Sequence, residues 1–195
     1  MKQGMELVGD YCVVVRMNGR SEIRKLKDVN SVFEEAKEII GCKWLDHARI
    51  QQISPDVVLE FLVNDEGYIQ WGNNPKKVNP IGTFFYNGGS FPDHYILGDI
   101  VMCLELYTED GGDFMGMSEA FATRVAMHTN QKIKPLAEEI CPIPDRVPDP
   151  VVKVSSYATL DDMVKAMKGD KSIKPTEETM ILGRTKDEEK KTEDN

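Results

Sequence analysis

Residues 11–19 have the sequence YCVVVRMNG, and this stretch decides how the fold begins. Its β-branched run favours an extended strand, and the Asn-Gly pair that ends it is a preferred two-residue hairpin turn. The segment from Ser21 to Lys27 can return as a short second strand with a half-exposed edge. The sequence therefore predicts a β-hairpin here.

A helix and a third strand are predicted next. Apolar residues recur at helical spacing over residues 29–40, and Gly41 provides a stop. Ser31 and Glu34 have the spacing of a capping box, in which each side chain bonds the backbone N–H of the other residue. Residues 42–53 are mixed in polarity but compatible with a strand, which the following proline ends.

Two apolar runs predict a second hairpin. Its strands would be residues 57–63 (VVLEFLV) and 68–71 (YIQW), joined by a short turn at residues 64–67. Gly67 can take the positive φ that such a turn demands. Residues 72–80 then form a connector, with one helical turn between its prolines.

Two more strands and a helix complete the expected core. Residues 81–86 are rich in aromatic side chains and predict a short strand, and residues 96–107 predict a long buried strand that is irregular at Gly98. A helix starts near Ser118, which can cap it. The predicted fold class is α+β: a mixed or antiparallel sheet with two to three packed helices, plus a mostly extended C-terminal segment.

Proline and charge predict the domain organisation. Five of the ten prolines lie in residues 135–150, which predicts an extended linker after a core domain of residues 1–134. Residues 151–169 predict a short strand and helix that cannot bury a core alone, so this appendage docks on the core or contacts a partner. Residues 170–195 are highly charged and predict a disordered tail.

Charge and hydrophobicity exclude several classes of protein. The chain carries 24 Lys and Arg against 33 Asp and Glu, a net charge of −9, which argues against nonspecific binding to nucleic acid or to anionic membranes. No stretch approaches the roughly 18–20 apolar residues that span a bilayer, and no secretory signal is visible. We therefore expect a soluble, cytoplasmic protein.

The four cysteines, Cys12, Cys42, Cys103 and Cys141, are scattered through apolar segments. No C-x-x-C pair or Cys/His couplet has the spacing of metal ligands. We expect free buried thiols, no metal and no cofactor.

Three short motifs stand at expected turns: Asn64-Asp-Glu-Gly67, Asn79-Pro-Ile-Gly82 and Leu97-Gly-Asp99. With the order of elements around them and the terminal helix, they resemble the uncharacterised family called domain of unknown function 3846, over roughly residues 11–134. The resemblance implies an origin in gut bacteria or in phage and conjugative-element gene sets, sometimes near antirestriction genes. That family has no established activity or catalytic residues.

Asp93, His94 and Asp99 are weak candidates for catalysis, because a carboxylate beside an imidazole can tune a general base near neutral pH. The competing interpretation is that these polar residues only shape a loop. The chain has no G-x-S-x-G, no P-loop and no G-x-G-x-x-G after a strand, so no catalytic residue is predicted outright.

An aromatic-rich stretch is the candidate binding surface for a protein or for stacked bases. Its candidate residues are Phe84, Tyr86, Phe91 and Tyr95. After Lys76 and Lys77 the next basic residue is Arg124, so direct nucleic-acid binding is not expected.

Other polar residues fit structural roles better. Glu109, Asp110 and Asp113 could offer oxygen ligands to calcium, but a hairpin turn explains them without the longer array of an EF-hand. His47 and His128 stand alone, and we expect both to be partly buried packing residues.

These observations favour a noncatalytic binding or regulatory accessory protein of phage or mobile-element origin with a protein partner. One alternative is an antirestriction DNA mimic, suggested by the acidic composition, although the charges are scattered among basic neighbours. The other alternative is a small enzyme that uses the Asp93, His94 and Asp99 loop.

Overall fold

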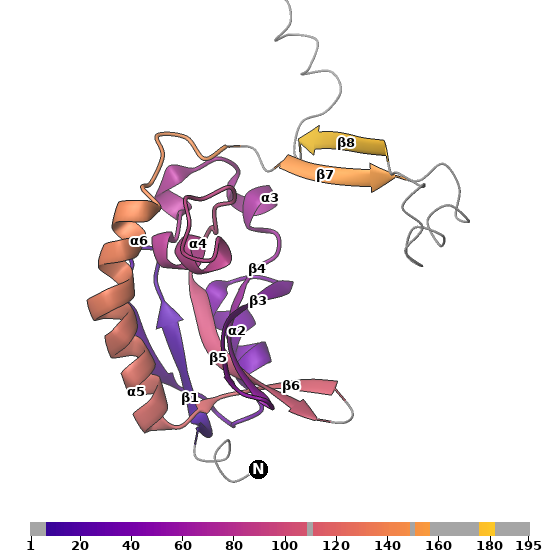
Figure 1. The fold of residues 1–195 in the computed structure, drawn as a ribbon. Helices are drawn as coiled ribbons and strands as arrows, with labels where there is room; N and C mark the ends of the chain where they lie inside the picture. Colours follow the sequence, from indigo (N-terminus) through magenta and orange to yellow (C-terminus); the bar gives the residue numbers. More distant parts are fainter. Residues whose placement is uncertain (1–6, 109–110, 149–150, 157–175, 182–195) are drawn as a thin grey trace, which may run out of the picture. The chain divides into compact units, whose positions relative to one another are not determined.

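Antiparallel pairing joins six strands into the central sheet (Figure 1). The strands are β1 (Val8–Val15), β2 (Ser21–Lys25), β3 (Leu45–Ser54), β4 (Val57–Asn64), β5 (Ile100–Thr108) and β6 (Gly111–Met115). Their order is β2-β1-β5-β4-β3, and β6 also pairs with β5. The computed structural model describes residues 7–108, 111–148, 151–156 and 176–181. The chain divides into a main unit, residues 1–147, and a second unit, residues 148–195.

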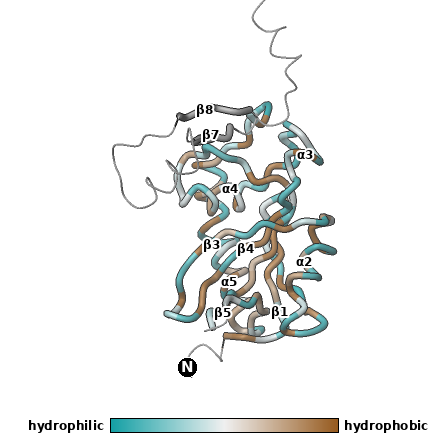
Figure 2. The backbone as a smooth tube through the Cα atoms, turned by 90° about the vertical axis from the view of Figure 1, so that its right-hand side faces the viewer, coloured by the Kyte–Doolittle hydropathy of each residue, from teal (hydrophilic) through white to brown (hydrophobic). Residues whose placement is uncertain are grey.

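Helices cover both faces of the sheet (Figure 1). They are α2 (Val32–Ile40), α3 (Gly67–Trp71), α4 (Pro80–Tyr86), α5 (Glu119–His128) and α6 (Lys134–Ile140), with a 3-10 turn (Pro75–Lys77) and a π-helical turn (Thr129–Ile133). Side chains alternate along each strand. Val13 and Val15 therefore join one core with α4, α5 and α6, while Cys12 and Val14 join a second core with α2. Figure 2 shows hydrophobic residues running through the central strands.

The predicted α+β class with an antiparallel sheet is confirmed, and so are several local predictions. β1 and β2 form the first hairpin, with Tyr11 opposite Lys25 and Val15 opposite Ser21. α2 ends at Gly41, whose φ of 76° is left-handed. The connector contains the one helical turn expected between its prolines.

The capping box predicted at the start of α2 is wrong. The Ser31 hydroxyl donates to Glu35 rather than bonding a backbone N–H inside the helix, and Glu34 pairs with Lys37 at 2.9 Å. Glu35 also accepts a hydrogen bond of 2.7 Å from the backbone N–H of Lys27. Glu35 lies on the buried side of α2, so it reaches the preceding loop, which the more exposed Glu34 does not.

Residues 68–71 form helix α3, so the predicted second hairpin is wrong; β4 instead pairs with β3 and β5. Tyr68 and Trp71, three positions apart, both pack against a small core around Leu97. Only a helix brings these two rings onto one side, because neighbours at that spacing share a helical face. Gly67 accordingly has no positive φ.

Residues 81–86 form most of helix α4, not the predicted strand. The Asn79 side chain caps the helix by accepting a 3.0 Å hydrogen bond from the Gly82 backbone N–H. Pro80 occupies the first turn, where its missing N–H costs nothing. This start signal outweighs the preference of aromatic residues for strands.

The strand predicted at residues 96–107 begins only at Ile100. Gly98, with a φ of 92°, turns the chain just before it, which is the predicted irregularity. β6 was not predicted, because two glycines and an aspartate give its sequence little strand character.

The expected extended linker at residues 135–150 is instead partly helical and packed. α6 follows α5 through the π-helical turn, and Pro135 lies in the first turn of α6, where proline is tolerated. Ala137, Cys141 and Val147 are fully buried. The main unit therefore extends past the boundary expected at residue 134 and reaches Val147.

The second unit contains an antiparallel pair, β7 (Val151–Ser156) and β8 (Thr176–Ile181). β7 agrees with the strand predicted at the start of the 151–169 appendage, whose predicted helix lies outside the described residues. β8 lies within residues 170–195, so the prediction of disorder is wrong for β8. The other residues of that tail lie outside the described ranges.

β3 pairs with β4 along one side and is the last strand in the sheet order. Its ladder is irregular, because the register shifts between Arg49 and Gln51 and again between Gln52 and Ser54. Each shift is a bulge that bends the strand.

Candidate functional site

The three Asp/His candidates do not meet in one site. Asp99 Oδ2 accepts a 2.8 Å hydrogen bond from Arg16, and its Oδ1 accepts one of 2.9 Å from the backbone N–H of Met17. Asp99 therefore fixes the end of the first hairpin. Asp93 is exposed, and His94 is half-buried in a different pocket from the hollow beside Asp99. The geometry brings no catalytic set together from these residues.

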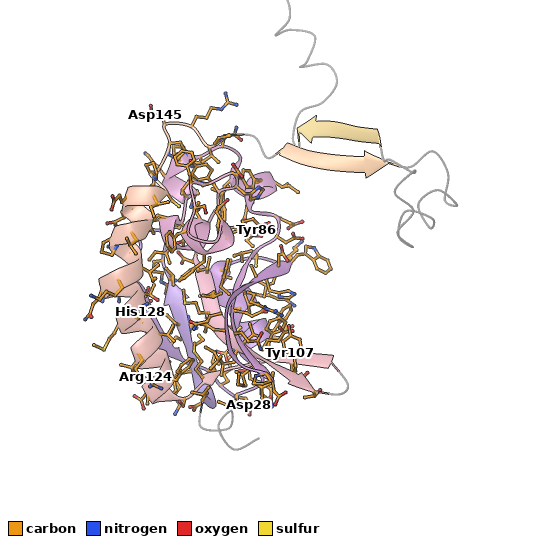
Figure 3. The ribbon with its side chains drawn as sticks, viewed as in Figure 1. Asp28, Tyr86, Tyr107, Arg124, His128 and Asp145 are labelled. Carbon is orange, nitrogen blue, oxygen red and sulfur yellow. The ribbon has the colours of Figure 1, made fainter. Side chains whose placement is uncertain are left out.

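The predicted binding aromatics lie in different environments. Phe91 is 71% exposed and Tyr86 is 45% exposed, whereas Tyr95 is only 7% exposed. Tyr86 is the last residue of α4 (Figure 3). Phe84 packs partly into the first core. Tyr86 and Tyr95 line one pocket with His94, so the structure brings together two of the four candidates.

An open hollow of about 710 Å³ lies between the end of α2 and α3, and we call it the corner hollow. Its lining residues are Lys37, Glu38, Gly41, Cys42, Lys43, Trp44, Glu66, Ile69 and Gln70. Trp44 is 63% exposed and Ile69 is 85% exposed. Two large apolar side chains thus border one concave surface and remain in contact with solvent.

The folded backbone around α2 and α3 explains why these side chains point outward. Gly41 ends α2 in a left-handed conformation, and the chain then reaches Trp44 just before β3 begins. In α3, Tyr68 and Trp71 take the inward positions against the small core. Ile69, one position after Tyr68, must then point away from that core.

The corner hollow carries charges of both signs. Lys37 and Glu38 take part in ion pairs of 2.9 and 3.5 Å with side chains outside the hollow. Lys43 and Glu66 make no ion pair within the described part of the chain. These two groups are available to pair with charges on another molecule.

A second, smaller pocket of about 100 Å³, the His94 pocket, also borders the segment that leads into α3. It is lined by Asp46, Val63, Asn64, Asp65, Gly67, Tyr68, Tyr86, His94, Tyr95, Ile96 and Leu97. The His94 ring lies 5.2 Å from the Tyr68 ring and 5.4 Å from the Tyr86 ring, between centroids. Burial lowers the pKa of His94 and raises the pKa of Tyr68.

Two buried glutamates lie on the α2 side of the sheet. Glu60 is 2% exposed, and its Oε2 lies 2.6 Å from His47 Nδ1. Glu105 is 7% exposed, and its buried Oε2 has no hydrogen-bond partner among the described residues. A side chain at Gly112 would collide with the Glu105 carboxylate, so this glycine makes room for it. Burial raises the pKa of Glu60 and Glu105 raises it further, while the hydrogen bond with His47 lowers it.

This glutamate pair is closed to a substrate. His47, whose side chain is 49% exposed, and Arg49, whose Nε lies 3.8 Å from Glu60 Oε1, connect the pair to solvent. Neither residue lines the corner hollow or the His94 pocket. The His47 ring packs on Phe114, as expected, but the residue is exposed rather than partly buried. His128 is exposed as well (Figure 3). The pair can hold a proton, but neither glutamate lines the corner hollow or the His94 pocket.

Sequence reasoning missed the corner hollow and the glutamate pair. The sequence does mark Glu60 as unusual, because it is the one carboxylate inside the apolar run VVLEFLV. Glu105 similarly interrupts the apolar part of β5. The sequence does not mark Trp44 and Ile69, since each lies in a segment whose fold depends on contacts distant in sequence.

The free thiols expected from the sequence are confirmed: Cys12, Cys103 and Cys141 are buried and Cys42 is half-buried. Burial raises the pKa of Cys12 to about 12, so this thiol is unreactive at neutral pH. Within the described ranges, no three His, Cys, Asp or Glu side chains gather to hold a metal ion. Asp113 is exposed on β6, and Glu109 and Asp110 lie outside those ranges.

No helix among the described residues is both long enough and apolar enough to cross a bilayer. No protein-family model matches the chain, and no curated protein or solved structure is significantly similar to it. The resemblance to domain of unknown function 3846 therefore stays a prediction.

Proposed function

We propose that this protein is a noncatalytic binding protein that recognises a partner protein at the corner hollow. The observation that carries the proposal is the exposure of Trp44 and Ile69, 63% and 85%, on one concave surface. A cytoplasmic location, which composition and the lack of a visible signal favour, belongs to the same proposal. So does an origin in a phage or mobile-element gene set, which the resemblance implies.

Energetics support a protein segment as the occupant. Covering an exposed apolar side chain of this size contributes on the order of 1.5–3 kcal/mol. Tryptophan is also among the residues that most often dominate binding energy at protein interfaces. A segment with an apolar side chain between Trp44 and Ile69, and charged groups facing Lys43 and Glu66, would match the hollow.

Ion pairing does not favour the DNA-mimic alternative. Among the described residues, acidic groups are interspersed with basic partners, as in Lys25 with Asp10 at 3.3 Å and Lys134 with Glu138 at 3.7 Å. A mimic needs a dense array of unpaired acids that resembles the phosphate backbone.

The proposal is tested by affinity purification of tagged full-length protein from a gut-bacterial lysate with quantitative mass spectrometry. Wild type is compared with Trp44→Ser, Ile69→Ser and the matched control Phe91→Ser, which changes an exposed aromatic residue outside the hollow. We expect one partner to be retained by wild type and the control and lost from both hollow variants.

The captured partner is then purified and titrated by calorimetry. We expect Trp44→Ser to weaken its binding at least about tenfold, as for an interface hot spot. Identical partner sets for all four proteins, or unchanged affinity, would refute the corner hollow as the binding surface.

A further inference from the structure

In the His94 pocket, the ring of His94 contacts two tyrosine rings. The His94 ring contacts Tyr68 at 5.2 Å and Tyr86 at 5.4 Å between centroids, with interplanar angles of 58° and 37°. The Tyr68 hydroxyl accepts a 3.2 Å hydrogen bond from the backbone N–H of Tyr95, which fixes that ring. Ring faces carry negative electrostatic potential and attract cations.

Two carboxylates add to the negative electrostatic potential of the His94 pocket. Asp46 and Asp65 both line the pocket, and neither forms an ion pair within the described part of the chain. No lysine or arginine lines the pocket. A cation that enters therefore meets two uncompensated negative charges and no repulsion from a basic side chain.

The imidazole does not oppose a cation either. Burial lowers the pKa of His94 below its ordinary value, so the ring is neutral at pH 7. None of the described groups forms a hydrogen bond with a His94 ring nitrogen. His94 thus presents an uncharged ring with a free nitrogen to whatever occupies the pocket.

Size limits the occupant. The pocket volume of about 100 Å³ is roughly three times the ~30 Å³ that one water occupies in the liquid. A nucleotide or a folded protein element does not fit in this space, whereas a substituted ammonium head does.

We propose that the His94 pocket binds the ammonium head of an alkylamine, held by the faces of Tyr68, Tyr86 and His94 and by the carboxylates of Asp46 and Asp65. The head belongs either to a lysine side chain of another protein or to a free small amine. This site shares no lining residue with the corner hollow, so the two proposals can be tested independently of each other.

The test is an NMR titration of the isotope-labelled full chain at pH 7 with choline and with its neutral isostere, in which carbon replaces nitrogen. We expect saturable shifts of the Tyr86 and His94 ring signals with choline, and none with the isostere at equal concentration. Equal responses to both probes, or no response to choline, would overturn the proposal.

Variants locate the binding. Tyr86→Leu keeps apolar bulk but removes a ring face, and Asp65→Asn removes a charge; each is expected to weaken choline binding about tenfold. Phe91→Leu and Asp93→Asn are the matched controls, because both residues are exposed and neither lines the pocket. If the controls weaken binding as much as the pocket variants do, the assignment is wrong.

A third probe, lysine capped at both its amino and carboxyl groups, distinguishes the two sources of the ammonium group. Tighter binding of capped lysine than of choline indicates a side chain of a protein ligand. Tighter binding of choline indicates a free quaternary amine. Either result supports the assignment of the pocket as an ammonium site.

Discussion

Asn79 joins three segments of the main unit through one fully buried amide. Its Nδ2 donates hydrogen bonds of 3.0 Å to the carbonyls of Val15 and Gly98, and its Oδ1 caps α4 at the N–H of Gly82. The end of β1, the turn before β5 and the start of α4 therefore depend on a single side chain.

We expect Asn79→Ala to lower the free energy of unfolding by about 2–4 kcal/mol, because it removes a helix cap and leaves buried carbonyls without a donor. Urea denaturation followed by circular dichroism measures this change. Asn30→Ala, at an exposed position, is the control and should change stability by less than about 0.5 kcal/mol. Similar losses in both variants would contradict the role of Asn79.

Glu60 predicts a pH dependence of stability. Burial raises its pKa in the folded protein, so the fold binds this proton more tightly than the unfolded chain does. The resulting stabilisation is fully present below the unfolded pKa, about 4.3, and is lost as the pH rises through the folded pKa. Glu60→Gln removes the titrating group but keeps its shape.

We therefore expect the stability of Glu60→Gln relative to wild type to increase from pH 4 to pH 8, measured by urea denaturation at each pH. Glu139→Gln, at an exposed position, should show no such trend. A relative stability of Glu60→Gln that stays constant or falls with pH would show that Glu60 is not held protonated by its surroundings.

At the scale of elements, length decides what the sequence can predict. β1, β4 and α2 have patterns long enough to exclude other structures, and all three were predicted. α3 and α4 are short, so their few apolar positions fit a strand as well as a helix. Contacts with Leu97 and the Asn79 cap decide between the two, and these contacts become visible only in the folded chain.

Gly98 gives a prediction for the junction between α3 and β5. Its φ is 92°, and an added Cβ would lie 2.5 Å from the Trp71 ring. We expect Gly98→Ala to cost about 2–4 kcal/mol, since backbone strain and overpacking add. Gly88→Ala should cost only about 1 kcal/mol, because Gly88 has a φ of 60° but nothing within 4 Å of such a Cβ.

Thermal unfolding of both alanine variants separates the two causes. Equal costs would mean that the Trp71 ring yields without penalty and that backbone strain alone matters at this junction.

At the scale of the whole molecule, the boundary of the main unit was the hardest feature to predict. A proline count correctly marks backbone that cannot donate hydrogen bonds, but it does not distinguish a linker from a helix whose proline lies in the first turn. The candidate surfaces depend on the same long-range folding. Tyr86, His94 and Tyr95 were predicted as candidates. The pocket also needs Tyr68, which lies in α3, a helix that the sequence analysis predicted as a strand.

Truncation tests that boundary. A chain ending at residue 148 should keep the fold of the main unit, whereas one ending at residue 134 loses the buried Ala137, Cys141 and Val147 and should be strongly destabilised. Thermal denaturation and the dispersion of NMR amide signals measure the difference. Equal melting temperatures for the two chains would place residues 135–147 outside the folded unit.

The bulges in β3 have a consequence for many copies of the protein together. A regular strand at the end of a sheet is a template on which another molecule can add its own strand, and repetition of that step produces fibrils. β3 shifts register twice within its length, so a neighbouring chain finds no long straight row of amide groups to copy. This irregularity should keep the protein dispersed at high concentration, even though its sheet does not close on itself.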